Sequence, residues 1–189
     1  LIDCRSGRTR YIRVPDDLAI VVVFSGDDRH LATSNYTRNR NALNRFKKRL
    51  GVETLRGVAP ERVKSFPLAR HVVSEQHRTL AAARALSRGD LERFGILMDE
   101  SHASLRDDFG VSTPALEALT TAFRDAGAFG ARLTGAGEGG CVVAAVPSQT
   151  SSTIAALAVR SATRHLGREL AWWTVHAVDG VARSTPQDR

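Results

Sequence analysis

The chain has 189 residues, which is enough for one domain with a proper hydrophobic core. With 42% hydrophobic and 25% charged residues, its composition is that of a folded globular protein and argues against disorder. No apolar run approaches the roughly 20 residues needed to cross a bilayer, and the N-terminus lacks the pattern of a secretory signal, so we expect a cytoplasmic protein without a membrane partner.

The formal charge of +7 raises the question of nucleic-acid binding. Basic residues are spread along the chain, with one concentration at Arg38, Arg40, Arg45, Lys47, Lys48 and Arg49. At about 100° per helical residue these side chains point in several directions, and no aromatic ladder accompanies them. We therefore treat nucleic-acid binding as the weaker interpretation.

The chain begins with an apolar run, residues 1–4, that has the character of a strand and that no methionine, turn or cap precedes. It contains Cys4, and Cys141 lies in a second strand-like run. Because C-x-x-C spacing is missing, we predict two buried free thiols rather than a disulfide or a zinc site.

Residues 17–24 are rich in β-branched side chains and predict a central strand that is buried on both faces of a sheet. A polar turn follows, after which Ser34 or Asn35 can cap a helix over about 36–50 that Gly51 ends. The side chains expected on the buried side of this helix are Leu43, Phe46 and Leu50.

Two further helices form a predicted helical pair. Pro60 and Pro67 bracket a linker-like segment, and a long helix then runs from about residue 69 to 87. Asp90 is the expected N-cap of the second helix. Its apolar face is made by Leu91, Phe94, Leu97 and Met98.

The polar block after this face, residues 101–108, invites comparison with a hydrolase triad because it contains Ser101, His102, Ser104, Asp107 and Asp108. Neighbouring residues on a helix diverge by about 100°, however, and a triad is assembled by the fold. No G-x-S-x-G elbow is present either. We predict a polar helix end that makes caps and local hydrogen bonds, without catalysis.

The last third of the chain begins with Thr113 as a helix cap and Pro114 at the first helical position, with the helix ending near Gly127. A strand, a glycine loop and a second strand follow. Residues 148–152 are expected to cap a helix to about Leu166, and 171–175 supply a final strand. The order of elements predicts an α+β fold with split β-α-β units.

The glycine loop lies within residues 130–141, G-A-R-L-T-G-A-G-E-G-G-C. Its spacing satisfies G-x-G-x-x-G, but a β-branched apolar run follows instead of a helix, and Arg160 stands where an acidic residue is expected. No Lys-Ser or Lys-Thr pair completes a Walker A motif. Two interpretations remain, an anion-binding nest and a simple hairpin connection, and spacing alone favours the hairpin.

The residues of this loop resemble the third signature motif of the galactokinase branch of the GHMP small-molecule kinases, G-A-R-[ML]-T-G-G-G-F-G-G-C. Residues 1–6, 70–75, 101–108 and 178–183 resemble galactokinase segments in the same order. The resemblance covers nearly the whole chain. It implies a ferredoxin-like GHMP kinase C-terminal domain with an added helical pair over 17–189, and it makes 1–16 the trailing edge of an N-terminal kinase domain.

The resemblance also implies a function, the ATP-dependent phosphorylation of the C1 hydroxyl of galactose, with Mg²⁺ entering through the nucleotide. Ser34-Asn35-Tyr36 and Arg40 match the family pattern [ST]-x-Y-N-x-R-R-x-E-C, whose tyrosine contacts the sugar, so Tyr36 is the implied substrate-binding residue. Without the resemblance, Tyr36 would be an aromatic that covers the helix start. The loop residues implied to support the phosphate site are Gly135, Ala136, Gly137, Glu138, Gly139 and Gly140.

The chain also departs from the family pattern. The phosphate loop P-x-G-x-G-L-S-S-S and the catalytic aspartate of an M-D-Q segment are absent, so we expect this chain to be inactive without an N-terminal kinase half. Thr37, Asn39, Ala42 and Leu43 differ from the tyrosine pattern. Glu138 replaces phenylalanine, and beside a triphosphate it would add repulsion of about 1 kcal/mol. We expect its side chain to face solvent or an arginine, or else the nucleotide fit to be impaired.

Three alternatives to a galactokinase stay open. The first is a kinase of the same family for another sugar. The second is a non-catalytic sugar-binding or regulatory module, which would bind sugar without turnover. The third is a nucleic-acid-binding surface, whose affinity would depend on salt and not on sugar.

Overall fold

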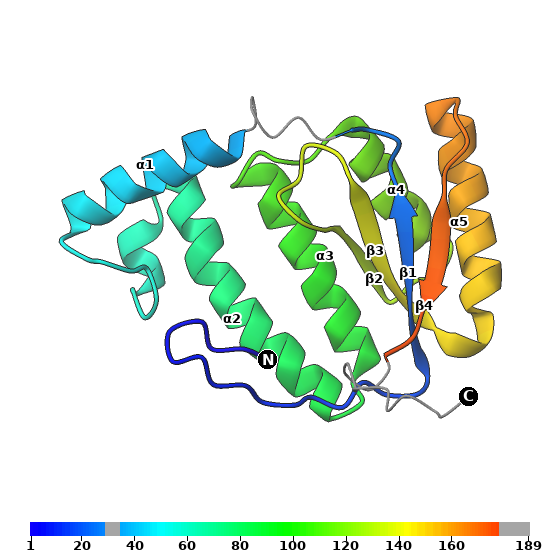
Figure 1. Ribbon diagram of the computed structural model, residues 1–189, viewed down its shortest axis with the longest axis horizontal. Coiled ribbons are helices and arrows are strands. Elements are labelled where there is room, and N and C mark those ends of the chain that lie inside the picture. Colours follow the sequence, from blue (N-terminus) through cyan, green and yellow to red (C-terminus); the bar gives the residue numbers. More distant parts are fainter. Residues whose placement is uncertain (29–34, 178–189) are drawn as a thin grey trace, which may run out of the picture.

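A single four-stranded antiparallel sheet organises the computed structural model, which describes residues 1–28 and 35–177 (Figure 1). The strands follow the order β2-β3-β1-β4, and each pairs with its neighbours in antiparallel register. Their bounds are Leu18–Phe24 for β1, Gly130–Leu133 for β2, Cys141–Pro147 for β3 and Trp172–Val175 for β4. The predicted α+β fold is confirmed.

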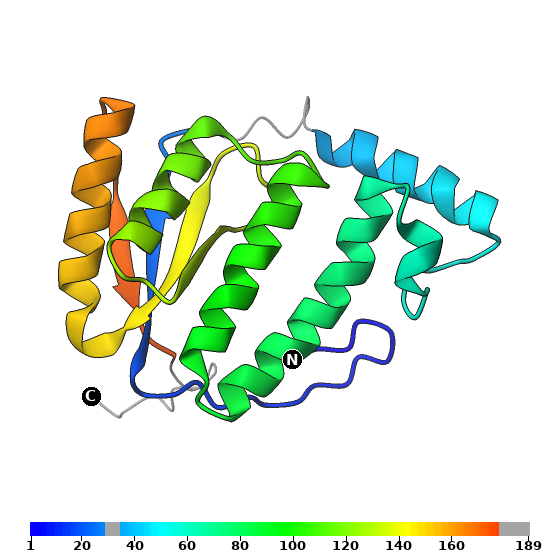
Figure 2. The same ribbon diagram turned by 180° about the vertical axis from the view of Figure 1, so that it is seen from behind.

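Strand β1 occupies the interior of the sheet as predicted, but it is fully buried on one face only. Ala19, Val21 and Val23 are completely buried, whereas Ile20 and Val22 on the opposite face are half-buried. The buried face packs against helices α4 (Pro114–Asp125) and α5 (Ser151–Leu166), which cover it together (Figure 2). This layer holds the main core. The opposite face is covered only in part, where Leu18 and Ile20 pack in a smaller cluster with Leu91 and Met98.

The two helices on the buried face begin differently. Thr113 Oγ1 accepts a hydrogen bond from Leu116 N at 3.3 Å and Pro114 is the first helical residue, as predicted for α4. The predicted side-chain cap of α5 is wrong, because a 3-10 turn over Ser148–Thr150 leads into this helix and no side chain caps it. Gly167 ends α5 in the left-handed conformation, as expected.

The predicted helical pair is confirmed as α2 (Pro67–Ser87) and α3 (Leu91–Asp107), with Asp90 capping α3 through the N–H of Arg93 at 3.0 Å. Helix α2 starts two residues before the predicted position because Pro67 fits the first turn of a helix. The predicted polar end of α3 is confirmed only at its last residues, where Arg106 and Asp107 are exposed. Ser101, His102 and Ser104 are buried, since the same helical stripe that carries Met98 and Leu105 turns them toward the interior.

Helix α3 lies against the free edge of strand β2 at very short range. A Cβ atom on Gly95 would stand 1.9 Å from the carbonyl oxygen of Phe129, and one on Gly130 would stand 2.0 Å from the carbonyl oxygen of Gly95. Two side chains of the helix then accept hydrogen bonds from the strand. Asp99 Oδ1 accepts from Ala131 N at 2.9 Å, and His102 Nδ1 accepts from Leu133 N at 3.3 Å. The helix therefore closes an edge that would otherwise be open to pairing.

A smaller hydrophobic cluster supports helix α1 (Asn35–Leu50) and the short 3-10 helix η2 (Pro60–Val63). The rings of Phe46 and Phe66 stack with centroids 4.3 Å apart, and Leu43 and Leu50 pack against the same cluster. The predicted buried side of α1 is confirmed.

Residues 1–16 run beside α2 and form no strand, apart from one isolated bridge between Ile2 and Thr9 (Figure 1). The prediction of a strand over residues 1–4 is therefore wrong, as is that of two buried thiols. Cys4 is exposed because no second strand covers it, and Cys141 is half-buried at the start of β3. Among the described residues, no helix has both the length and the apolar character required to span a membrane.

Candidate functional site

The glycine loop, defined here as residues 134–140, connects β2 to β3 as a hairpin at one end of the sheet (Figure 1). Gly135, Gly137, Gly139 and Gly140 all have positive φ angles, between 77° and 119°. Only glycine adopts such angles readily, so the run of glycines is required by the backbone path.

Two neighbouring connections hold this loop in place. The N–H of Glu138 donates to Val111 O at 2.7 Å, and the N–H of Gly140 donates to Asp27 O at 3.0 Å. A Cβ atom on Gly137 would lie 2.4 Å from Val111 O, and one on Gly139 would lie 2.6 Å from Asp27 O. The loop is thus hydrogen-bonded to, and closely packed between, the α3–α4 connection and the segment that follows β1.

Four N–H groups of the loop have no hydrogen-bond acceptor within residues 1–28 and 35–177, those of Gly135, Ala136, Gly137 and Gly139. Gly135 is exposed and Ala136 half-buried, whereas Gly137 and Gly139 are buried. Buried N–H groups are nearly always paired in folded proteins, and consecutive free amides in a glycine-rich loop are a recurrent way of binding anions. Of the two interpretations left open by the spacing, this geometry favours the anion-binding nest.

The side chain of Glu138 makes a contact that the sequence did not predict. Its two carboxylate oxygens lie 2.9 and 3.0 Å from the backbone N of Asn35, the first residue of α1, and no arginine among the described residues pairs with it. A carboxylate is stabilised there because the N-terminus of a helix carries partial positive charge. The carboxylate therefore has a backbone partner that the sequence did not predict, in a half-buried position.

Tyr36 directly follows Asn35 in the first turn of α1, and its side chain lies outside the described residues, as does Ser34. The contact between Glu138 and Asn35 joins positions that are 103 residues apart in sequence. The fold thus brings the two predicted parts of the site, the start of α1 and the glycine loop, next to each other. The matching segment 178–183 lies outside the described residues.

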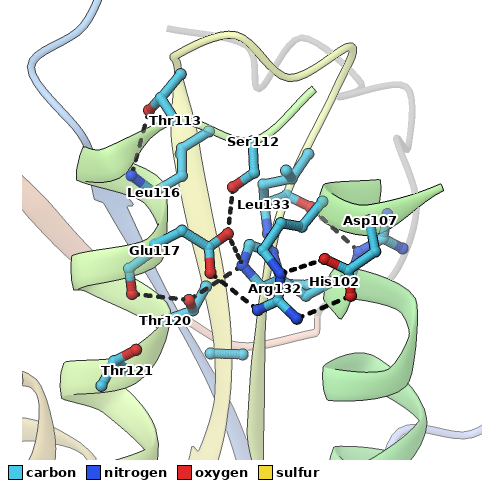
Figure 3. A network of polar contacts seen from close by, with 12 residues as sticks. His102, Asp107, Ser112, Thr113, Leu116, Glu117, Thr120, Thr121, Arg132 and Leu133 are labelled. Atoms are coloured by element: carbon cyan, nitrogen blue, oxygen red, sulfur yellow. Dashed lines mark hydrogen bonds and ion pairs between the residues drawn. The ribbon is translucent and has the colours of Figure 1, made fainter. Parts of the chain in front are cut away.

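A buried polar network is centred on His102 (Figure 3). It contacts Leu133, the last residue of β2 before the glycine loop. Because His102 Nδ1 accepts from Leu133 N, the proton is on Nε2, which lies 2.8 Å from Glu117 Oε1 and 3.1 Å from Thr120 Oγ1. Burial lowers the pKa of His102 and outweighs the opposing charge of Glu117, so the imidazole is neutral at neutral pH. The network ties α3, α4 and β2 together just below the glycine loop.

Glu117 is the second member of this network. Burial alone would raise its pKa, but the hydrogen bonds from Ser112 and Arg106 and the charge of Arg106 lower it overall. Arg106 Nη1 donates to Glu117 Oε2 at 3.2 Å from the exposed side. The carboxylate is therefore ionised, and it holds the His102 ring in one orientation.

The serines of residues 101–108 also bond to carboxylates on the interior side. Ser101 Oγ donates to Glu75 at 2.8 Å, and Ser104 Oγ donates to Asp108 at 3.1 Å while accepting from His71 Nδ1 at 2.9 Å. A hydroxyl that donates to a carboxylate is not activated by the neighbouring imidazole. These contacts are structural. The bond between Ser104 and Asp108 is local, as predicted, whereas those to Glu75 and His71 reach across to α2.

Sequence reasoning missed the burial of His102 and the contact of Glu138. His102 follows Met98 by four residues and precedes Leu105 by three, a spacing that marks the buried stripe and could have shown its place in the core. No comparable signal exists for the Glu138 contact, because its partner is a backbone amide far away in the chain.

Comparison with known proteins identifies the domain. Residues 82–165 match the family model described as GHMP kinases C terminal. The chain contains a GHMP kinase C-terminal domain. The chain is 42% identical to the galactokinase of Roseiflexus sp. (strain RS-1) over 201 aligned residues. The alignment covers 97% of this chain and 51% of that relative.

Solved structures of GHMP kinases agree with this assignment. The galactokinase of Lactococcus lactis, solved in complex with galactose, matches with a TM-score of 0.81 and 32% identity over 92% of this chain and 49% of its own. The mevalonate kinase of L. major, in complex with R-mevalonate, matches with a TM-score of 0.56 and 27% identity over 88% of this chain and 44% of its own. The chain spans about half the length of the relatives that it matches.

Proposed function

We propose that this chain forms the C-terminal part of a cytoplasmic, galactokinase-type kinase that transfers the γ-phosphoryl group of ATP to the C1 hydroxyl of galactose. The observation that carries the proposal is the 42% identity to a galactokinase along 97% of the chain. Residues 17–189 would be the C-terminal domain, and residues 1–16 the trailing edge of the N-terminal kinase domain.

In this proposal the glycine loop supports the nucleotide phosphates. The free amides of Gly135, Ala136, Gly137 and Gly139 have the chemistry that phosphate oxygens require, and the positive φ angles aim several of them from one short segment. Gly140 and Glu138 fix the loop to the body of the domain through their own N–H groups. Mg²⁺ would enter with ATP and neutralise charge on its phosphates.

Tyr36 is the proposed contact to the sugar. Its place in the first turn of α1, next to the loop, supports this role because the phosphoryl acceptor has to lie close to the phosphate site. The phosphate loop and the catalytic aspartate of the family are absent from the sequence, so the proposed partner is an N-terminal kinase half, and the chain alone is expected to be inactive.

The test is complementation. The chain would be mixed with the half of the Roseiflexus sp. galactokinase that it does not cover, and galactose phosphorylation would be followed by a coupled assay, with each half alone as control. Turnover only in the mixture supports the proposal. Turnover by the chain alone would contradict the predicted inactivity, and galactose binding without turnover in the mixture would favour a non-catalytic sugar-binding module.

A further inference from the structure

Helix α1 has a strongly basic composition and no acidic residue in its first turn that could complement the positive end of the helix dipole. The negative charge at its N-terminus comes instead from Glu138, whose two oxygens both reach the N–H of Asn35. An anionic acceptor at this place satisfies a free helix amide and complements the helix dipole. The start of α1 is therefore held by the glycine loop.

The backbone at Glu138 indicates that the side chain matters. Within residues 1–28 and 35–177, Glu138 is the only non-glycine residue with a positive φ, at 58°. Its neighbours on both sides are glycines, and a glycine here would remove the strain. Because the N–H of Glu138 is itself bonded to Val111 O at 2.7 Å, the carboxylate projects toward α1 from a fixed base.

A second tether acts on the same helix one turn further along. Asn39 is 4% exposed, and its Nδ2 donates to Phe109 O, at the end of α3, at 2.8 Å. Glu138 and Asn39 are both positions at which this sequence departs from the galactokinase pattern. Each of the two departures thus makes a polar contact that attaches the first turns of α1 to the domain.

We propose that Glu138 is a positioning residue that fixes the first turn of α1, and with it Tyr36, against the glycine loop. The carboxylate, which stands where the family pattern has phenylalanine, makes a charged hydrogen bond between the glycine loop and the start of α1. Its consequence for sugar binding rests on the proposed function, whereas the tether itself does not.

The tether is tested on the full chain by amide hydrogen exchange resolved by NMR. Glu138→Ala should raise the exchange rate of the Asn35 amide about tenfold, because a charged acceptor is lost. Glu138→Gln, which keeps an acceptor oxygen, should recover part of the protection. Arg45→Ala, at an exposed position of α1, is the matched control and should change nothing. Equal rates in Glu138→Ala and wild type would overturn the tether.

The role in sugar binding is tested in the complemented kinase. Glu138→Ala should raise the KM for galactose about tenfold and leave the KM for ATP and kcat within about twofold, with Glu138→Gln in between. An unchanged KM for galactose, or an equal rise in both KM values, would overturn the positioning role. If the complemented wild-type kinase shows no turnover, both the proposed function and the role of Glu138 in sugar binding are contradicted. The exchange experiment then tests the contact between Glu138 and Asn35 independently.

Discussion

Strand β2 and the glycine loop are adjacent in the chain, but their backbone N–H groups differ in whether they have hydrogen-bond acceptors. On β2 the outward N–H groups of Ala131 and Leu133 are both taken by side chains of α3. In the loop, the amides of Gly135 and Ala136 have no acceptor among the described residues. We call the contact between α3 and β2 at Ala131 and Leu133 the seam. The seam stabilises the fold, whereas the loop amides remain available to bind another molecule.

The largest effect is expected from Gly95→Ala, which breaks the seam at its closest point. The new Cβ would stand 1.9 Å from the carbonyl oxygen of Phe129, so α3 has to move away from β2. We expect a loss of about 3 kcal/mol in the free energy of unfolding, measured by urea denaturation.

Gly89→Ala is the control for this experiment, because Gly89 has a φ of 69° and no atom lies within 4 Å of the place that the new methyl group would take. Its free energy of unfolding should fall by only about 1 kcal/mol, the strain of an alanine in the left-handed conformation. Equal losses in the two variants would show that the close approach of α3 and β2 is not what matters.

A somewhat smaller loss is expected from His102→Ala. The substitution removes the acceptor of Leu133 N and the partner of Glu117 inside the core, which should cost about 2 kcal/mol of unfolding free energy. His77→Ala, on the exposed side of α2, should stay within about 0.5 kcal/mol. Wild-type stability in His102→Ala would contradict the structural role of the network.

The smallest of these effects is that of mild acid. Burial lowers the pKa values of His71 and His102 in the folded state, so the unfolded chain binds protons first as the pH falls below about 6.5. The stabilisation is complete above that pH and is lost progressively as the pH falls from about 6.5 toward the lowered pKa values of the folded state.

Urea midpoints at about pH 7 and about pH 5.5 measure the acid effect. The pKa values of Glu75 and Glu117 are also lowered, but carboxylates lose their contribution only below their unfolded values near pH 4.3, outside this window. His102→Gln should show a shallower dependence than the wild type. A protein that is equally stable at both pH values would contradict the assignment of two buried neutral histidines.

Local sequence signals predicted most of the fold. The Thr113-Pro114 start of α4, the Asp90 cap of α3 and the hairpin around the glycine loop depend on neighbouring residues, and all three are present. The errors concern contacts that depend on the whole fold. Residues 101–108 look like a polar helix end until α4 and β2 are placed around His102. Cys4 looks like a strand residue, but within residues 1–28 and 35–177 its segment makes only the isolated bridge between Ile2 and Thr9.

The candidate site divides in the same way. The motif pointed to the loop and to Tyr36, but only the fold shows that the loop and the start of α1 touch through Glu138. Whether a loop amide is paired also depends on which carbonyl groups of distant segments lie near it, as Val111 and Asp27 do here. Sequence spacing carries no information on such partners.

Amide hydrogen exchange of the full chain, resolved by NMR, tests the difference between seam and loop most directly. The amides of Ala131 and Leu133 should exchange only through global unfolding, whereas those of Gly135 and Ala136 should exchange close to the rate of an unstructured peptide. Comparable protection of the loop amides and the strand amides would contradict the account, because the loop would then have no free N–H groups to offer to a phosphate.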